Sequence, residues 1–215
     1  MPFKPTEREY RQFAALTADN ANQDNEQMLV RGYASTYQPY VLYEAGEDRV
    51  IEEVDPHAFD GADISDVIMQ YDHAGRVFAR TKNGSLQVTP DEHGLLVIAD
   101  LSGSDIARGI YSDIRSGLID SMSFGFIVKR DSWNHDEVDA NGIRIHKRRI
   151  LEFKKIFDVS VVSLPANPTT EINTYRNLCE GVIQEFRLEQ QKRENDELEA
   201  AKLAARIRAI LLSKE

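Results

Sequence analysis

Between Met28 and Pro165 the sequence alternates between short apolar runs and turn-forming segments. The runs VLYE and RVIEEV flank the turn residues of AGED, and the runs LQV and LLVIADL flank TPDEHG. Asn141-Gly142 is a further hairpin-turn signal. Short runs of β-branched and aromatic residues bounded by Gly, Pro, Asn and Asp are typical of strands in hairpins. The pattern predicts about six to eight short strands and argues against a fold built mainly from helices.

Two short helices are predicted among these strands. In the segment from Ser104 to Leu118, isoleucine or leucine recurs at positions 106, 110, 114 and 118, which is the spacing of one helix face. Ser104 or Asp105 can cap its first turn, and Gly117 ends or kinks it. A shorter helix is expected to begin at Ala58–Phe59, after Asp55 and Pro56.

The remaining chain divides into three parts. Residues 1–28 are polar and predict a flexible N-terminal segment, residues 29–173 form the β domain, and residues 174–215 form a helical tail. The predicted fold is mainly β with flanking helices (α+β), an antiparallel, closed or nearly closed β-barrel with a C-terminal helical extension. The tail has an apolar stripe interrupted over residues 189–197, which fits either packing on its own domain or an assembly arm.

The charge and cysteine content exclude several classes of protein. The net charge of −10 gives no clustered basic surface for nucleic acid. The single cysteine, Cys179, allows no intrachain disulfide, and we expect a buried small hydrophobic side chain there. No window is apolar enough for a membrane span or a secretory signal. We therefore expect production in a cytosol.

Ser123 is the first residue that could carry chemistry. In the run SMSFGF, Met122, Phe124 and Phe126 face one side of a strand, while Ser123 and Gly125 face the other. A serine becomes a nucleophile when a base takes its proton, and the glycine would let a substrate backbone approach closely. Small residues on a solvent-facing strand would produce the same local pattern.

His73 and Asp158 are the candidate partners of such a serine. His73 lies at a turn after an apolar run, and histidine is the usual general base near neutral pH. Asp158 lies among apolar residues, where a carboxylate is costly unless it has a partner such as an imidazole. The alternatives are an exposed turn histidine and an edge-strand aspartate paired with Lys154 or Lys155.

Other chemistries have weaker support in the sequence. Asp55, His57, Asp72 and His73 lack the spacing of known metal motifs, so we predict no metal and no cofactor. There is no nucleophile-elbow motif, phosphate-binding glycine loop or dinucleotide fingerprint. These absences argue against α/β-hydrolases, kinases and dehydrogenases.

Taken together, the segments resemble the prohead proteases of tailed bacteriophages. The matching stretches are VRGYASTY, EEVDPHAFD, YDHAGRVFART, HGLLVIADL, RSGLIDSMSFGF and FDVSVVSLPANPTTEI, in this order. The resemblance implies a serine protease with a β-barrel fold like that of herpesvirus assembly proteases.

Roles for particular residues follow from the resemblance. It implies Ser123 as nucleophile, His73 as general base and Asp158 as third member, with His146 and Glu152 as alternatives for that member. Arg148 and Arg149 are candidates for oxyanion support. The family often has Asn-His-Asp where this chain has Asp72-His73-Ala74, and a nearby Asp72 carboxylate would raise the pKa of His73.

The resemblance also implies partners and a location. Expected substrates are the scaffolding protein, the major capsid protein or its scaffold segment, and the chain itself, cut within residues 176–215. The portal is a further candidate partner, a homo-oligomer is an open alternative, and neither nucleic acid nor membrane is expected. The site of action would be the procapsid in the host cytoplasm. The alternatives are an inactive capsid-assembly or scaffolding protein of the same fold, and a metal-dependent hydrolase using Asp55, His57 and His73.

Overall fold

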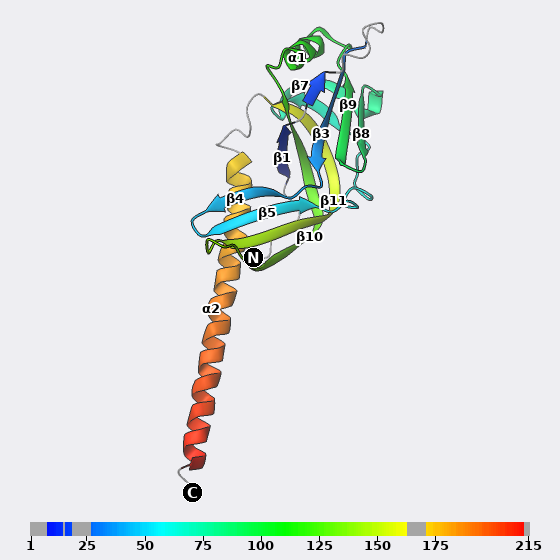
Figure 1. Ribbon diagram of the computed structural model, residues 1–215. Coiled ribbons are helices and arrows are strands. Elements are labelled where there is room, and N and C mark those ends of the chain that lie inside the picture. The colour runs from blue at the N-terminus through cyan, green and yellow to red at the C-terminus, as the bar shows by residue number, and fades with distance from the viewer. Residues whose placement is uncertain (1–7, 15, 19–26, 163–170, 213–215) are drawn as a thin grey trace. The chain divides into compact units, whose positions relative to one another are not determined.

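The computed structural model describes residues 8–14, 16–18, 27–162 and 171–212, and its strands form two sheets (Figure 1). The strands are β1 (Glu9–Ala14), β2 (Leu16–Ala18), β3 (Leu29–Thr36), β4 (Tyr40–Ala45), β5 (Asp48–Val54), β6 (Ile68–Tyr71), β7 (Ala74–Arg80), β8 (Leu86–Pro90), β9 (Gly94–Asp100), β10 (Ser121–Val138) and β11 (Arg144–Val162). The helices are the 3₁₀ turn η1 (Thr81–Asn83), α1 (Asp105–Arg115) and α2 (Glu171–Leu212).

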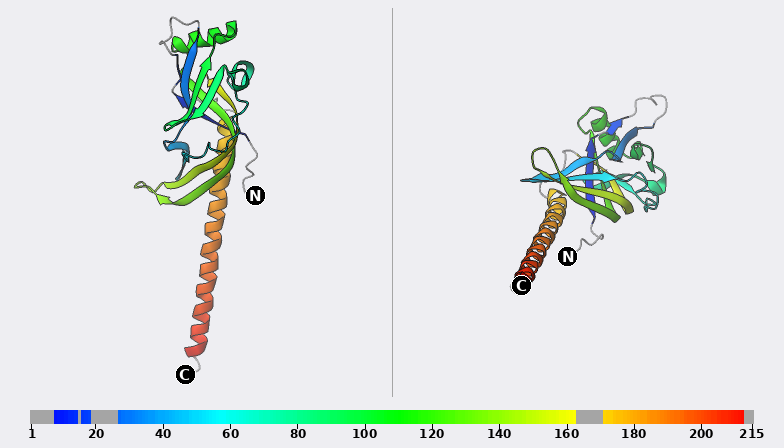
Figure 2. Two further views of the ribbon diagram at one scale, coloured as in Figure 1. Left: turned by 90° about the vertical axis from the view of Figure 1, so that its right-hand side faces the viewer. Right: turned by 60° about the horizontal axis from the view of Figure 1, so that its bottom comes forward.

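The long hairpin of β10 and β11 organises the larger sheet, and it can be followed in three orientations (Figures 1 and 2). The sheet has the order β1-β10-β11-β5-β4, and β6 and β7 pair at the other end of β11. The second sheet has the order β2-β3-β9-β8. The expected hairpin turn lies at Asn141-Gly142, where Gly142 has a φ of 82°, a conformation that glycine adopts without strain.

The predicted closed antiparallel barrel is wrong, because within the described residues neither sheet closes on itself. Strand β11 pairs in parallel with β5 along Arg144–Ile150 and with β6 along Asp158–Val161. One 19-residue strand therefore serves two separate parallel partners. Hairpin signals in a sequence report only local antiparallel pairing, so they could not reveal these crossovers.

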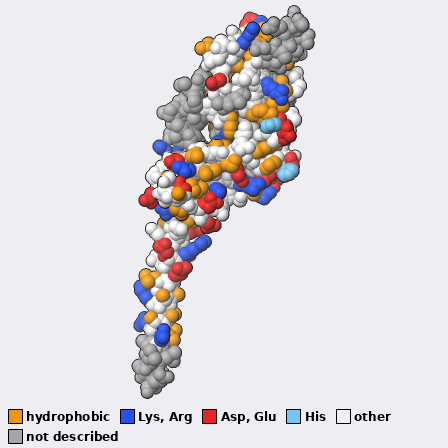
Figure 3. Space-filling view, in the orientation of Figure 1, with side chains coloured by type: hydrophobic (Ala, Val, Ile, Leu, Met, Phe, Trp, Pro, Cys, Tyr) orange, Lys and Arg blue, Asp and Glu red, His pale blue; other side chains and the backbone are white. Residues whose placement is uncertain are grey.

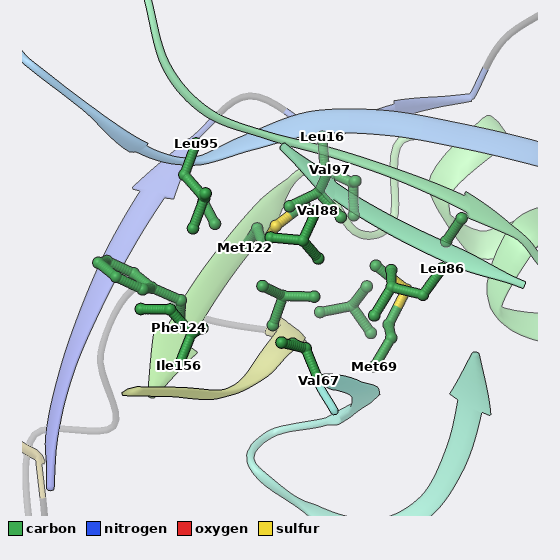
Figure 4. Close-up of a cluster of buried hydrophobic side chains, with 14 of the residues drawn as sticks. Leu16, Val67, Met69, Leu86, Val88, Leu95, Val97, Met122, Phe124 and Ile156 are labelled. Atoms are coloured by element: carbon green, nitrogen blue, oxygen red, sulfur yellow. The ribbon is translucent and has the colours of Figure 1, made fainter. Parts of the chain in front are cut away.

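The two sheets face each other across a shared hydrophobic core (Figure 4). Leu86, Val97 and Leu16 reach it from the smaller sheet, and Met122 and Ile156 reach it from the larger one. Burying each large side chain is worth about 1.5–3 kcal/mol relative to exposure. The alternation predicted for the strand around Ser123 is thereby explained, because its aromatic face forms part of this core.

Outside the core, the predicted helices have different outcomes. Helix α1 is present, and the Ser104 hydroxyl caps it by accepting a hydrogen bond from the Ala107 amide at 3.2 Å. The helix expected at Ala58–Phe59 is replaced by turns, because its amides bond three residues back, as from Ala58 to Asp55. The segment 1–28, expected to be flexible, contains β1 and β2, while residues 1–7 and 19–26 lie outside the described residues.

The chain separates into two compact units, Met1–Tyr175 and Arg176–Glu215, and the second consists of most of α2. Cys179 is buried, as expected. Along the helix, Leu188, Leu198, Leu203 and Ile207 are exposed, and charged side chains of both signs lie between them (Figure 3). None of the described helices is long and apolar enough to cross a membrane.

A buried group of charges fixes β1 to the larger sheet. The guanidinium of Arg148 bonds to Glu9 at 2.6 Å and to Glu52 at 2.9 Å. Arg11 bonds to the same two carboxylates, at 2.7 Å to Glu9 and 2.6 Å to Glu52. Tyr40 donates a further hydrogen bond to Glu52. The nearby guanidinium groups of Arg11 and Arg148 outweigh burial and lower the pKa of Glu52 to about 2.

We predict that Arg148→Met destabilises the fold by about 3–5 kcal/mol, because removing one member of a buried ion pair leaves the other charges without compensation. The matched control is Arg149→Met, because Arg149 is 49% exposed and pairs with Glu53 and Asp55. Its loss should cost about 1 kcal/mol or less. Urea unfolding of both variants measures the difference, and equal losses would contradict the buried network.

Candidate active site

Ser123 lies near the start of β10, with a neighbouring strand on each side. Its cross-strand partners are Ser160 on β11 and Gln12 on β1. The side chain of Ser123 is completely buried, although the sequence pattern placed it on the face away from the core. Its hydroxyl oxygen lies 2.6 Å from the Nε2 atom of His73.

His73 reaches this position from the two-residue turn between β6 and β7. Asp72 and His73 have φ angles of 45° and 56°, which are left-handed values for non-glycine residues. Two such residues form the tight turn that best matches strand twist, and Asp and His tolerate it better than most. Strand β6 lies beside β11, and the Asp72 amide bonds to the Val161 carbonyl at 3.0 Å. This contact holds the turn beside β11.

Asp158 binds the other side of the imidazole. Its Oδ2 atom lies 2.5 Å from His73 Nδ1 and accepts a hydrogen bond from the Ser160 hydroxyl at 2.6 Å. Arg8 forms an ion pair with the other carboxylate oxygen, Oδ1. The Asp158 side chain is fully buried. The two contacts at Oδ2 and the Arg8 charge beside Oδ1 compensate a carboxylate that would otherwise be costly to bury, and Oδ1 itself accepts no hydrogen bond from the described residues.

The order of these contacts fixes the tautomer of His73. A carboxylate can only accept, so the Nδ1 atom of His73 donates to Asp158. The neutral imidazole then presents an unprotonated Nε2 to the Ser123 hydroxyl, which donates its hydrogen. The arrangement can therefore move the serine proton to the histidine while the carboxylate stabilises the resulting imidazolium.

Gly125 provides the space in which Asp158 and Arg8 meet. A Cβ atom at this position would collide with the Asp158 carboxylate oxygen and with the guanidinium of Arg8. The sequence suggested that this glycine leaves room for a substrate backbone. In the structure, the absence of a side chain also leaves room for the ion pair of Asp158 with Arg8.

The pKa of His73 is lowered to about 4, first because the ring is buried and second because the Arg8 charge is close. The net shift of this pKa is opposite to the rise expected from a nearby Asp72 carboxylate, because burial and the Arg8 charge both lower it. The ring is therefore neutral at neutral pH, which is the form that can accept a proton.

The two alternative third members lie elsewhere. His146 is fully buried, with Nε2 2.9 Å from Asp48 and Nδ1 2.7 Å from the His135 ring. Glu152 pairs on the surface with Lys129 and Arg130. Neither contact involves His73, so the structure brings Asp158, and not these residues, to the imidazole.

The arginines considered for oxyanion support also face other partners. Arg148 bonds to Glu9, whereas the next residue, Tyr10, packs against the His73 ring. Successive residues of a strand point to opposite faces, so Arg148 lies on the face of the sheet opposite His73 and Ser123. Arg149 pairs with Glu53 and Asp55. The structure therefore does not bring either arginine to Ser123.

Of the residues considered for a metal, Asp55 accepts from the His57 amide at 2.8 Å, and His57 contacts Asp60 at 3.1 Å. Among the described residues, no group of three or more His, Cys, Asp or Glu side chains is arranged to hold a metal ion.

Three residues at the site were missed from the sequence: Arg8, Tyr10 and Ser160. Tyr10 packs edge-on against His73, with ring centroids 4.3 Å apart. Ser160 shares its strand face with Asp158, and Arg8 shares its face with Tyr10. Residues two apart in a strand share a face, so the spacing of Ser160 from Asp158 and of Arg8 from Tyr10 was the available signal. It locates Arg8 and Tyr10 at the site only once the pairing of β1 with β10 is known.

A model of the caudovirus prohead serine protease family matches residues 15–184. This range contains Ser123, His73 and Asp158. No curated protein and no solved structure gives a significant match.

We predict that Gly125→Ala lowers the reactivity of Ser123 toward a fluorophosphonate probe by about 100-fold, because displacing a reacting group by about 1 Å has an effect of this size. The matched control is Gly109→Ala in α1, where an added Cβ meets open space. Labelling rates followed by intact mass measure the effect. Equal rates in the two variants would show that Asp158 and Arg8 tolerate the extra methyl group.

We also predict a pH dependence of stability that originates at His73. In the unfolded chain His73 titrates near its usual pKa of about 6.5, and in the folded chain at about 4. Between these values the unfolded state binds more protons, so stability falls as the pH drops from about 6.5 to about 4. Wild type should lose up to about 3 kcal/mol more than His73→Gln across this window. Urea unfolding at several pH values tests this, and parallel curves would contradict it.

Proposed function

Because the chain belongs to the caudovirus prohead serine protease family, we propose that it is the serine endopeptidase that matures the prohead, with Ser123 as nucleophile, His73 as general base and Asp158 as the orienting carboxylate. The observation that supports this most directly is the continuous contact from Ser123 through His73 to Asp158. Membership of this family supports action in the procapsid within the host cell.

The proposed reaction is acyl transfer. The Ser123 oxygen forms a bond to the peptide carbonyl carbon while its proton passes to His73 Nε2. The amide C–N bond then breaks, and the same proton moves to the leaving nitrogen. Water, deprotonated in turn by His73, releases the acyl group and regenerates Ser123. Asp158 keeps its charge throughout and stabilises the imidazolium.

The proposed substrates are proteins enclosed in the prohead. They are the scaffolding protein, the major capsid protein or its scaffold segment, and the C-terminal tail of this chain. The tail forms a separate compact unit, and its side chains from Arg187 to Arg208 are exposed, so a cut in that stretch would leave the β domain intact. The resemblance of the fold to herpesvirus assembly proteases is part of the same proposal.

One observation favours a second function, that of a catalytically inactive capsid-assembly or scaffolding protein. Ser123 and Asp158 have no exposed surface, and the His73 side chain is 8% exposed. A substrate has no access to a site closed in this way. The two functions differ in whether Ser123 ever reacts.

We predict that a fluorophosphonate probe labels wild type at Ser123 and leaves Ser123→Ala unlabelled. Because the proposed substrates include the tail of this chain, incubated wild type should lose mass from residues 176–215, whereas Ser123→Ala should stay intact. Peptide mapping and intact mass spectrometry measure both, on the purified protein and on proheads assembled with it. If neither the purified protein nor the proheads show labelling of Ser123, and wild type and Ser123→Ala keep equal intact masses in both, the inactive scaffold is favoured.

A further inference from the structure

The proposed catalytic groups are sealed from solvent, and β1 forms part of the seal. The reacting serine oxygen must come within about 3–3.5 Å of a substrate carbonyl carbon. Ser123 has no exposed surface in this structure. Some element must therefore move before a peptide can bind.

The alternate residues of β1 lie directly over the site. Tyr10 pairs with Gly125 and Gln12 pairs with Ser123, and directly opposed residues share one face of a sheet. The Tyr10 ring packs on His73 with centroids 4.3 Å apart, and Arg8 binds Asp158. Three successive residues on this face of the N-terminal segment thus contact or oppose the three proposed catalytic groups.

Strand β1 also occupies a particular kind of position. It is the last strand at one end of the larger sheet, and among the described strands β10 pairs with β1 and β11 alone. Without β1, the backbone edge of β10 that runs past Ser123 would have unpaired amides and carbonyls. Such an edge binds an extended peptide as an additional strand.

We propose that this edge of β10 is the substrate-binding site, that an extended segment of the substrate pairs with it, and that β1 occupies it in the resting protein and must leave first. This inference rests on the function proposed above. Strand β1 also precedes the residues 15–184 that match the family, so the matched region does not include the strand that covers the site.

The opposite face of β1 indicates which substrate segments this edge accepts. There Glu9 binds Arg148, and Arg11 binds Glu52, in fully buried pairs. When β1 leaves, Arg148 and Glu52 each lose one partner of opposite charge. An incoming strand restores both pairs if it carries an acid and, two residues later, an arginine.

The chain contains one such segment in its tail. Glu9-Tyr10-Arg11 in β1 has the same order of acid, aromatic residue and arginine as Glu185-Phe186-Arg187 in α2. The segment is helical, so it must unwind before it can pair as a strand. The structure therefore assigns residues near Glu185 as a self-derived substrate strand for this edge.

The position of Arg8 beside Asp158 fits an inactive resting state of the protein. Its charge beside Asp158 lowers the pKa of His73 further than burial alone. A weakly basic imidazole is a poor acceptor for the serine proton. Departure of β1 removes this charge, so opening the site and strengthening the base would occur together.

The first test compares the labelling of Ser123 by a fluorophosphonate in full-length variants. Arg8→Ala and Tyr10→Ala remove the cover but keep Glu9 and Arg11, so both should label about tenfold faster than wild type. The control is Tyr43→Ala on β4, the strand at the other end of the same sheet, which should label at the wild-type rate. Slower or unchanged labelling of Arg8→Ala and Tyr10→Ala would overturn the inference and show that β1 is a permanent part of the site.

The second test holds β1 in place. Ala14 and Ser121 are opposed in register, so cysteines at both positions, with Cys179→Ala, can form a disulfide between β1 and β10. The oxidised protein should label at least tenfold more slowly than the same sample after reduction. Equal rates would show that β1 does not need to leave.

The third test addresses the substrate. Tyr10→Ala should cleave or bind a peptide of residues 182–190, VIQEFRLEQ, at least fivefold better than the same peptide with Glu185 and Arg187 exchanged. Equal handling of the two peptides would overturn the charge preference. If Ser123 fails to label in every variant, the proposed function itself is wrong; if it labels at one rate in all of them, only the role of β1 is wrong.

Discussion

The buried carboxylate of Asp158 is the constraint around which the site is built. A fully buried charge requires several donors, and three elements of the fold supply them. The β6–β7 turn supplies His73, β11 supplies Ser160, and the N-terminal segment supplies Arg8. Gly125 leaves the gap in which these groups meet. The parallel pairing of β6 with β11 matters because it brings the turn to the carboxylate.

A second set of buried charges lies on the other face of β1. Glu9 and Arg11 interlock with Glu52 and Arg148, while Arg8 and Tyr10 contact the site. The N-terminal segment Arg8–Arg11 is therefore held on both faces by charge. Such pairs contribute little net stability compared with apolar packing, but they are costly to break singly, and so they define one register. A register fixed in this way keeps Gln12 opposite Ser123.

The sequence predicted those features that depend on neighbouring residues. The alternation around Ser123, the Asn141-Gly142 turn and helix α1 all follow from periodicities and turn residues within a few positions. The three site residues came from segments resembling a known family, and their chemical roles stay a proposal. The closed barrel was wrong because parallel partners of β11 lie far away in the chain. The same reason hid Arg8 and Tyr10. Arg148 became a candidate through the family resemblance, and the strand pairing places it on the other face of the sheet.

A closed site is also what the chemistry of enclosed maturation would require. A protease packed among its own substrates would need to stay inactive until assembly is complete, and β1 on the edge of β10 would, under this proposal, provide that restraint without another protein. A substrate strand can replace β1 without loss only if it restores the ion pairs that β1 made with Glu52 and Arg148. An acid and an arginine two residues apart recover them, whereas an apolar strand leaves Glu52 and Arg148 short of partners. Selectivity for substrate and restraint of the free enzyme would then have one origin, the two buried charges beneath β1.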